Sequence, residues 1–417
     1  MRMRVSALMS IASRCWSTRT VALAASFATA AVVGPVAFAE TPLVQNGQAG
    51  FVVSDIKYAL AEDAEKTGAC PRGMSKHVAE IYSMTPQGKR RRGESEGDYS
   101  KRLEEGSREL SAAANGQNVC MNPEAAVPDP HFRTVEAADI PVDGIDLDGV
   151  DSKAGDASAG MCPHQDFVGV RGERGIDNQF FRVVGCTRSY HSSGQSNGFA
   201  IEMLTGAWGI LLTLDGVDDL RNDDSVEVGI FANADPIQLS PTREPLSYAT
   251  YAMDQDPRFR AKTRGRIQEG VLTTEPVDVR FHKVTNSLRL ERPLKNARLR
   301  VTISESGVLE GYLGGYTPVE DMYDLQFGFR NGKNEAGELG PLRLRFGTAN
   351  GAARVLGYTC PGVYHSLYQY ADGDPDPQSG RCTSISVQYR IKAIPAFVVD
   401  VATESVNTKL TTSAKQP

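Results

Sequence analysis

Residues 225–231 read SVEVGIF, and Val226, Val228 and Ile230 occupy every second position while Glu227 lies between them. A period of two puts the apolar side chains on one face of a β-strand and the polar ones on the other. Six further stretches read as strands, most of them with this alternation: FAIEML (199–204), WGILLTL (208–214), VDVRFHKV (277–284), SLRLERPL (287–294), ARLRVTIS (297–304) and GVLEGYLGGY (307–316). Turn residues separate them about every ten positions, which predicts an antiparallel β-sandwich over residues 162–401.

The sandwich is expected to be of the jelly-roll or lectin-like type, because two packed sheets bury the apolar stripes and a lone sheet does not. Its C-terminal part adds a short helix that begins at Pro361 and a long strand, SISVQYRIKAIPAFVV (384–399). The last residues, 402–417, are polar and are predicted to be a disordered tail.

A helical pattern precedes the strands. VVSDIKYALAEDAEKTGAC (52–70) and GDYSKRLEEGSRELSAAANG (97–116) both carry apolar residues at helical spacing. We expect residues 40–122 to form a small helical hairpin, and the whole chain to be of the α+β class. Residues 123–161 are rich in Pro, Gly and Asp without periodicity, which predicts an acidic linker.

The first 39 residues predict export from the cytoplasm. Four arginines precede an apolar run, and the run ends in the small-x-small sequence Ala37-Phe38-Ala39. This is the pattern of a cleaved signal peptide, with a retained membrane anchor as the alternative. No later stretch is apolar for long enough to span a bilayer, so we expect no transmembrane span after cleavage and a periplasmic or secreted location.

The charge of the chain argues against nucleic acid as a partner. Removal of residues 1–39 takes away four of the 45 basic residues and none of the 51 acidic ones, which leaves a net charge near −10. An acidic surface repels phosphate backbones and anionic headgroups. A cation, a glycan or an envelope protein is the expected kind of partner.

Six cysteines remain after residue 39, and an even number in an exported chain predicts disulfides. They are Cys70, Cys120, Cys162, Cys186, Cys360 and Cys382. Fifteen pairings are possible, and their order along the chain favours 70–120, 162–186 and 360–382, the first of which would staple the helical hairpin. Their spacing matches no C-x-x-C, haem-attachment or zinc motif, and nucleotide-binding motifs are absent as well.

Two acidic stretches are candidate calcium sites, because calcium binds six to eight hard oxygens. In ADGDPDPQSGRC (371–382), the aspartates alternate as in the first half of an EF-hand loop. However, Pro377 replaces the glycine of that loop and Thr383 its closing glutamate. A looser calcium loop remains open beside a plain turn. The candidate ligands there are Asp372, Asp374 and Asp376, and those in the predicted linker are Asp146, Asp148 and Asp151.

Two other polar stretches are open to more than one interpretation. In GIDNQFFRVVGC (175–186), we expect Asp177 to lie in a turn where side chains hydrogen-bond the local backbone. A role in an ion site is the alternative. The loop DGVDDLRNDDS (215–225) favours a charged hairpin connection. The positions of the acidic loops in the sequence do not show whether these loops meet in space.

Catalysis has weak support in the sequence. GQSNG (194–198) has the spacing of a nucleophile elbow around Ser196, but it lacks the preceding apolar strand that this motif requires. Paired carboxylates on a sheet could hydrolyse a polysaccharide, and the strands offer Glu202, Glu227, Asp278 and Glu310. No pair stands out, so the sequence assigns no catalytic residue. It favours a non-catalytic exported binding or structural protein of a bacterial-type envelope, with a polysaccharide hydrolase or lyase as the alternative.

Overall fold

The computed structural model describes residues 43–61, 68–137, 139–153, 162, 164–190, 202–204, 208–285, 288–330 and 342–401. These residues belong to one compact unit, Leu43–Pro417. The predicted signal peptide (1–39), the predicted tail (402–417) and Ser196 lie outside the described residues.

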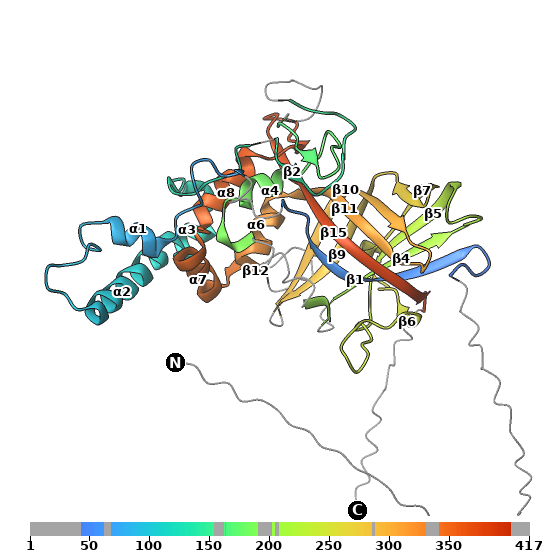
Figure 1. Ribbon diagram of the computed structural model, residues 1–417, viewed down its shortest axis with the longest axis horizontal. Coiled ribbons are helices and arrows are strands. Elements are labelled where there is room, and N and C mark those ends of the chain that lie inside the picture. Colours follow the sequence, from blue (N-terminus) through green and yellow to red (C-terminus); the bar gives the residue numbers. More distant parts are fainter. Residues whose placement is uncertain are drawn as a thin grey trace, which may run out of the picture. The chain divides into compact units, whose positions relative to one another are not determined.

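One mostly antiparallel sheet of 11 strands dominates the fold (Figure 1). Its main strands run in the order β1-β4-β5-β7-β8-β10-β11-β15, and β1 also pairs with β15, so the sheet closes into a ring. The bounds are β1 Gln48–Tyr58, β4 Ile210–Asp215, β5 Asp223–Ala232, β7 Arg260–Gln268, β8 Val271–Thr274, β10 Leu288–Ile303, β11 Leu309–Pro318 and β15 Cys382–Val399. The predicted sandwich of two sheets is therefore not confirmed, whereas the β-rich, antiparallel character is.

Shorter strands extend the ring. Strand β9 (Val277–Thr285) pairs with the first part of β10, and β14 (Gly373–Pro375) pairs with the start of β15. Strand β6 (Ala249–Ala252) lies parallel to the end of β15. Two small ribbons join β2 (Pro141–Val142) to β3 (Val168–Gly169), and β12 (Gly328–Arg330) to β13 (Leu342–Leu344).

Strand β1 corrects the prediction of a helix over residues 52–70. Its β-branched residues Val52, Val53 and Ile56 are all buried, which suits a pleated strand flanked on both sides. Residues Gln48–Val52 pair with β4, and most of β1 pairs with β15. A bulge lies between Val53 and Asp55 and shifts the register by one residue. The apparent helical spacing of apolar residues here was coincidental.

The helices gather beside the end of the sheet where β15 begins (Figure 1). Their bounds are α1 Val78–Met84, α2 Glu96–Ala114, α3 Gln117–Met121, α4 Gln179–Val184, α6 Val319–Phe327, α7 Phe346–Leu356 and α8 Cys360–Gln369, with single 3₁₀ turns at Pro123–Ala125, Arg188–Tyr190 and Pro257–Phe259. The predictions of α2 and α8 are confirmed. Helix α2 begins where the Ser95 side chain accepts from the Asp98 amide, and α8 where Thr359 accepts from Gly362. Among the described residues, none of these helices has the length and apolarity to cross a bilayer.

All six predicted cysteines form disulfides, but the sequential pairing was wrong. The bonds are Cys70–Cys186, Cys120–Cys360 and Cys162–Cys382. The physical reason is that helices distant in sequence pack together: α3 lies against α8, which brings Cys120 to Cys360. Two disulfides therefore tie α3 and Cys162, just after the predicted linker, to the C-terminal part of the chain, and the third ties the residues after β1 to those after α4.

Candidate metal centre

The polar face of β15 forms the floor of the candidate site. Ser384, Ser386 and Gln388 alternate along this strand with apolar residues, and all of them are buried. The Gln388 side-chain amide donates to the carbonyl oxygens of Ile145 (2.8 Å) and Asp177 (2.7 Å). Part of the predicted acidic linker thus packs on the sheet, where its residues Ile140, Val142, Ile145 and Leu147 are buried.

Three carboxylates meet above this floor. Asp146, Asp148 and Asp177 each offer an oxygen, and these oxygens all lie within 4.8 Å of one another. We call these three residues the carboxylate triad. Asp146 and Asp148 come from the loop after β2, whereas Asp177 directly precedes α4. Gly175, at φ +73°, allows the close approach, because a Cβ atom there would lie 2.9 Å from the Val150 carbonyl oxygen.

Two more aspartates interact electrostatically with the triad. Asp166 and Asp372 both raise the pKa of Asp177, and Asp146 and Asp148 raise that of Asp166. We call the triad together with Asp166 and Asp372 the acidic cluster. Its members come from the loop after β2, from both sides of the Phe167–Ile176 bridge, and from Asp372 far along the chain.

Backbone amides hold these carboxylates in place. The Leu147 amide donates to Asp177 Oδ2 (2.6 Å), the Ser152 amide to Asp166 Oδ2 (2.7 Å) and the Ser386 amide to Asp372 Oδ1 (2.7 Å). The other two triad members cap turns in their own loop: Asp146 accepts from Gly149 (2.6 Å) and Asp148 from Val150 (2.8 Å). These hydrogen bonds orient the side chains of the acidic cluster.

Burial makes the ionised form of the cluster costly. It raises the pKa of Asp372 to about 7, and burial together with the neighbouring carboxylates raises that of Asp166 to about 7. Burial, followed by the charges of Asp166 and Asp372, holds the pKa of Asp177 well above its usual range. Burial also raises the pKa of Asp146. At neutral pH the cluster is stable only with bound protons or with a nearby positive charge.

Arginines supply part of that charge. Arg182, in α4, is buried and attracts Asp166 and Asp372, but its hydrogen bonds go to Gln179 Oε1 (2.7 Å) and the Gln165 carbonyl (2.6 Å). Arg298 acts on Asp146 over a longer range, with no direct ion pair to it. Within the described residues, the five aspartates of the acidic cluster thus exceed the nearby arginines in charge.

Tyr316, in β11, points a further oxygen at the cluster. The residue is 3% exposed and packs with Ile145 and Leu147. In the described part of the chain its hydroxyl makes no hydrogen bond. Burial raises its pKa, and so do four of the five carboxylates, namely Asp177, Asp372, Asp148 and Asp166.

The other predicted ligands have different partners. Asp151 is exposed and pairs with Arg174 (2.7 Å). Asp374 binds Lys295 Nζ (2.8 Å) and the Ser384 hydroxyl (2.8 Å). Asp376 accepts from the Ser379 amide (2.7 Å) and so closes its own turn. The three alternating aspartates of 371–382 therefore have separate partners, and only Asp372 belongs to the acidic cluster.

Sequence reasoning named Asp177 as a minority alternative and missed Asp166. Nothing around Asp166 in the sequence distinguishes it, since only the pairing of Phe167 with Ile176 brings its segment alongside Asp177. The third acidic loop (215–225) behaves as a hairpin connection, in which Asp223 accepts from the Asp218 and Ser225 amides.

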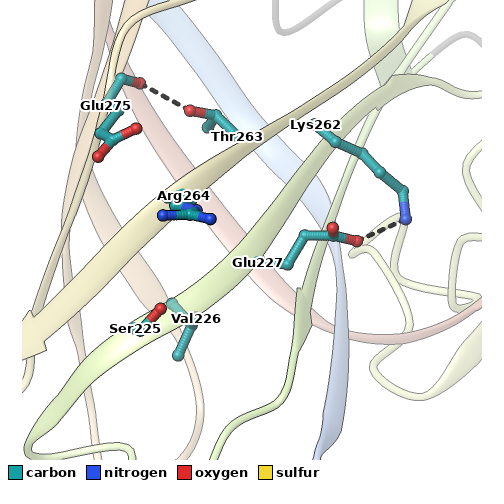
Figure 2. A pocket seen from close by; sticks show the side chains of 7 residues that line it. All are labelled: Ser225, Val226, Glu227, Lys262, Thr263, Arg264 and Glu275. Atoms are coloured by element: carbon teal, nitrogen blue, oxygen red, sulfur yellow. Dashed lines mark hydrogen bonds and ion pairs between the residues drawn. The ribbon is translucent and has the colours of Figure 1, made fainter.

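Figure 2 shows a second polar feature, a hollow of about 430 Å³ on strands β5 and β7. Glu227 forms an ion pair with Lys262 (2.5 Å) and lies directly opposite Arg264 in the register. The hollow is lined by Ser225, Val226, Glu227, Lys262, Thr263, Arg264 and Glu275. It is open and polar, and two carboxylates face it.

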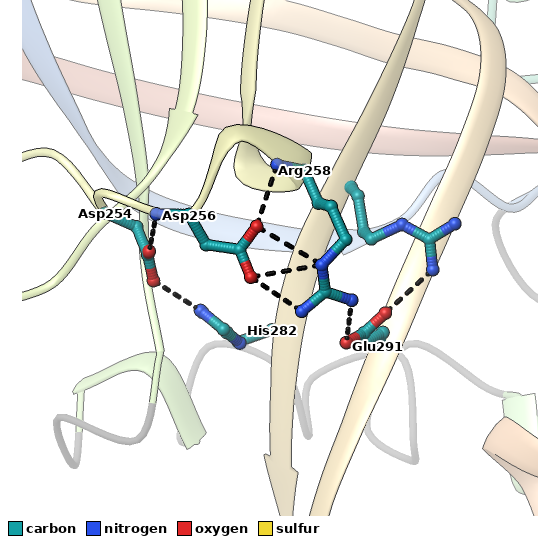
Figure 3. Close-up of polar contacts among 6 residues, drawn as sticks. Asp254, Asp256, Arg258, His282 and Glu291 are labelled. Carbon is teal, nitrogen blue, oxygen red and sulfur yellow. Dashed lines mark hydrogen bonds and ion pairs between the residues drawn. The ribbon is translucent and has the colours of Figure 1, made fainter. Parts of the chain in front are cut away.

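A third feature is an ion network around His282, in β9 (Figure 3). His282 Nε2 lies 2.7 Å from Asp254 Oδ2, and its ring lies 3.9 Å from that of Phe259. Arg258 bridges Asp256 and Glu291, with 2.7 Å to each carboxylate. This network fastens the segment after β6 to the β9–β10 hairpin. It pairs a histidine with a carboxylate, but within the described residues no serine or cysteine is hydrogen-bonded to His282, so it does not form a catalytic triad.

The chain matches no family model, and comparison with curated proteins and with solved structures finds no significant similarity. The function must therefore be argued from the site alone.

Proposed function

We propose that this chain is an exported, disulfide-bonded binding or structural protein of a bacterial-type envelope, and that its acidic cluster holds a divalent cation. The observation that carries the proposal is the carboxylate triad, whose member Asp177 is only 4% exposed. Asp146 is exposed and Asp148 half-buried, but carboxylates this close to one another and to a buried one repel, and a divalent cation converts that repulsion into attraction.

Calcium is the cation that fits best. The donors are carboxylates from Asp146, Asp148 and Asp177, with Asp166 and the Tyr316 hydroxyl nearby. Calcium prefers hard oxygen ligands and tolerates irregular geometry, whereas zinc and copper favour nitrogen and sulfur. The triad contains no histidine or cysteine.

The proposed role of the cation is structural. The triad joins the loop after β2 to the segment before α4, where Asp177 precedes the N-cap Asn178, and Gln388 fixes both segments to the sheet. A cation that binds only the folded chain stabilises it in proportion to the logarithm of its concentration. The periplasm or the extracellular medium, the location proposed here, is also where disulfides persist.

The test compares calcium binding by two variants of the same loop. Asp146→Asn/Asp148→Asn removes two triad charges, and Asp151→Asn removes one exposed charge outside the triad. After treatment with chelator, calorimetric titration with CaCl₂ should show binding by the wild type and by Asp151→Asn, with a rise in Tm. The double variant should show neither. No heat and no Tm shift in the wild type would refute the cation proposal.

The partner of the protein is proposed to be a glycan or an envelope protein, and the hollow of Figure 2 is the candidate contact surface. It presents hydroxyls, carboxylates and an arginine, groups that hydrogen-bond sugar hydroxyls. Arg264→Ala and Ser225→Ala should weaken binding in a glycan-array screen of the wild-type protein. An array with no ligand would leave a protein partner as the proposal, to be sought by co-purification from the envelope.

A polysaccharide hydrolase or lyase is the second candidate, because Glu227 and Glu275 face the same hollow. Of the other carboxylates considered from the sequence, Glu310 pairs with Lys392 (2.9 Å) and Asp278 accepts from the Asn296 amide (2.9 Å). Glu227→Gln and Glu275→Gln should then each abolish release of reducing sugars from envelope polysaccharide. Glu227 is half exposed and paired with Lys262, which makes it a poor general acid and places this candidate second.

A further inference from the structure

One row of residues on the outer face of the sheet gathers cations. The row follows the hydrogen-bonded register across six strands and reads, from β7 through β8, β10, β11 and β15 to β1, Arg266, Thr273, Arg300, Tyr312, Arg390 and Lys57. On each strand the next residue is buried, so these six side chains point outward. We call them the basic row. It holds four cations and no carboxylate, although acidic residues outnumber basic ones in the chain.

The fold leaves most of this positive charge unneutralised. In the described part of the chain, the side chains of Arg266, Arg300 and Lys57 form no ion pair and no hydrogen bond. Arg390 has one carboxylate near it, at 3.8 Å from Asp143 Oδ2. Arg266 and Arg390 are exposed, and the other members of the row are half-buried. The basic row is therefore positively charged and open to an anionic ligand.

Carboxylates flank the basic row on both sides. On one side, Glu310 and Asp55 lie two residues along β11 and β1. On the other side, Glu275 lies just beyond the end of β8. Two residues of a strand span about 7 Å, so the positive strip is narrow. A flat anionic membrane on this face would meet these acids, whereas a linear polymer that runs along the row would not.

We propose that the basic row binds a linear anionic polysaccharide, which runs across the strands with its acidic groups over the four cations. This inference rests on the proposed glycan partner, and it gives that glycan a charge and a surface of its own. The basic row shares no residue with the hollow of Figure 2. The two surfaces can therefore be tested separately.

The spacing of the row suits a polymer rather than a single anion. Neighbouring strands lie about 4.8 Å apart, so Arg266, Arg300 and Arg390 recur about every 10 Å. A guanidinium group binds a carboxylate or a phosphate through paired hydrogen bonds. Each of the three arginines can therefore hold one acidic group of the polymer, and Lys57 extends the charge beyond them onto β1.

Two residues between the arginines suit the neutral parts of a sugar chain. Thr273 offers a hydroxyl, and Tyr312 offers an aromatic ring with a polar tip. The Tyr312 hydroxyl donates to Asp143 (2.7 Å), which holds the ring between Arg300 and Arg390 in the register. Cations that alternate with a hydroxyl and a ring favour an acidic glycan over an anion without sugar rings.

The first experiment measures Kd of the full chain for polygalacturonate, a linear polymer with a carboxylate on each sugar, in low salt and with chelator. Chelator is present because calcium would bridge the polymer to carboxylates of the protein. Arg266→Gln/Arg300→Gln removes two charges of the basic row, and Arg72→Gln/Arg108→Gln removes two exposed charges elsewhere. Kd should rise about three- to tenfold in the first variant and less than about twofold in the second. No binding by the wild type, or equal Kd values in the two variants, would overturn the inference.

The second experiment uses the wild type and covers the case of a variant that fails to fold. The protein is titrated with polygalacturonate, with its uncharged methyl ester, and with vesicles of phosphatidylglycerol. Only polygalacturonate should bind, and its Kd should rise at least about fivefold between about 50 mM and about 200 mM NaCl, because salt screens exposed charges. Equal binding of the ester would show a glycan site without charge recognition, and stronger binding of the vesicles would show a membrane surface. Either result would overturn the inference.

A third variant separates this inference from the proposed function. Arg264→Ala/Ser225→Ala changes the hollow of Figure 2 and leaves the basic row intact. It should bind polygalacturonate with the Kd of the wild type. If this variant loses the polymer while Arg266→Gln/Arg300→Gln keeps it, the glycan lies in the hollow. The proposed glycan partner would then stand, and the inference would be overturned.

Discussion

Strand β15 buries opposite kinds of charge on its two faces. On one face the hydroxyls of Tyr389 (2.7 Å) and Tyr58 (3.1 Å) accept hydrogen bonds from Arg292, which is 2% exposed. On the other face Ser386 and Gln388 support the acidic cluster. The arginine is closed to water, whereas the acidic face is only partly so, since Asp177 is buried and Asp146 is exposed. The arginine is held by neutral phenols and aromatic rings, and the aspartates mainly by backbone amides.

The difference shows which buried charge can respond to its surroundings. A guanidinium does not lose its proton at any pH that a protein survives, so the arginine face carries a fixed charge. A buried carboxylate does exchange a proton, and the pKa values of Asp166 and Asp372, at about 7, place that exchange near neutrality. The acidic face can therefore change its charge near neutral pH, and the proposed cation would compete with these protons. The free energy of unfolding should therefore depend on pH through the acidic face and not through the arginine face.

The largest expected effect is the pH dependence of stability without a cation. The folded pKa values of Asp166 and Asp372 lie above those of unfolded aspartate, so the folded chain binds more protons at intermediate pH. Their contribution to stability is complete below about pH 4, is lost progressively as pH rises from about 4 to about 7, and is absent above that. One group shifted by about 3 pKa units costs on the order of 4 kcal/mol above pH 7.

Urea unfolding of chelator-treated protein between pH 5 and 8 measures this loss directly. Millimolar calcium should remove most of the decline, because the cation replaces the protons on the carboxylates. If the free energy of unfolding stays constant over this pH range without cations, the carboxylates of the acidic face do not change protonation between pH 5 and 8, which contradicts the prediction.

Removal of the fixed charge should have a smaller effect that does not depend on pH. Arg292→Met deletes hydrogen bonds to Tyr58 and Tyr389 and keeps much of the packing volume. We expect a loss of about 2–3 kcal/mol in the free energy of unfolding, equal at pH 5 and pH 8. Lys262→Met, at an exposed ion pair, is the control and should change stability by less than about 0.5 kcal/mol. A pH-dependent loss in Arg292→Met would mean that the two faces are coupled.

The contrast between the faces could be predicted only in part from the sequence. Alternation revealed β5, β10, β11 and β15, whereas apolar residues at helical spacing revealed α2 and Pro361 revealed the start of α8. The closure of the ring was hidden, because pairing of β1 with β15 joins residues such as Tyr58 and Tyr389 across most of the chain. Periodicity describes the faces of a strand and contains no information on its neighbours. Strand β7, RAKTRGRIQ, was missed since its outward residues are basic and its inward ones small.

The candidate site was predictable to a similar extent. Asp146 and Asp148 stand two apart in one loop, and their spacing drew attention to them. Asp177 completes the triad from another segment, and Asp151, the neighbour that the spacing favoured, turns to Arg174 instead. The order of the cysteines along the chain predicted the wrong disulfides for the same reason that alternation could not predict which strands pair. Contacts between distant segments depend on packing of the whole chain rather than on local pattern.

A single triad substitution tests whether repulsion is present in the metal-free protein. Asp177→Asn keeps an oxygen that can accept from the Leu147 amide, and removes one buried negative charge. At pH 8 without cations we expect this variant to be more stable than wild type by about 1–2 kcal/mol, since it lacks the desolvation and repulsion of that charge. With calcium the order should reverse. Asp151→Asn, measured in parallel by urea unfolding, should follow the wild type under both conditions, and destabilisation of Asp177→Asn without calcium would contradict the prediction.

The smallest effect is expected at the exposed end of the stretch 371–382. Asp376→Ala removes acceptors for the Gln378 and Ser379 amides, which water can replace because this turn is exposed. We expect a slightly lower free energy of unfolding at neutral pH, and an unchanged Kd for calcium. Asp372→Asn, four residues earlier, should instead flatten the pH profile, because that carboxylate is buried in the acidic cluster. Calcium binding that weakens in Asp376→Ala would extend the site to the exposed turn, and would mean that the alternating aspartates act together after all.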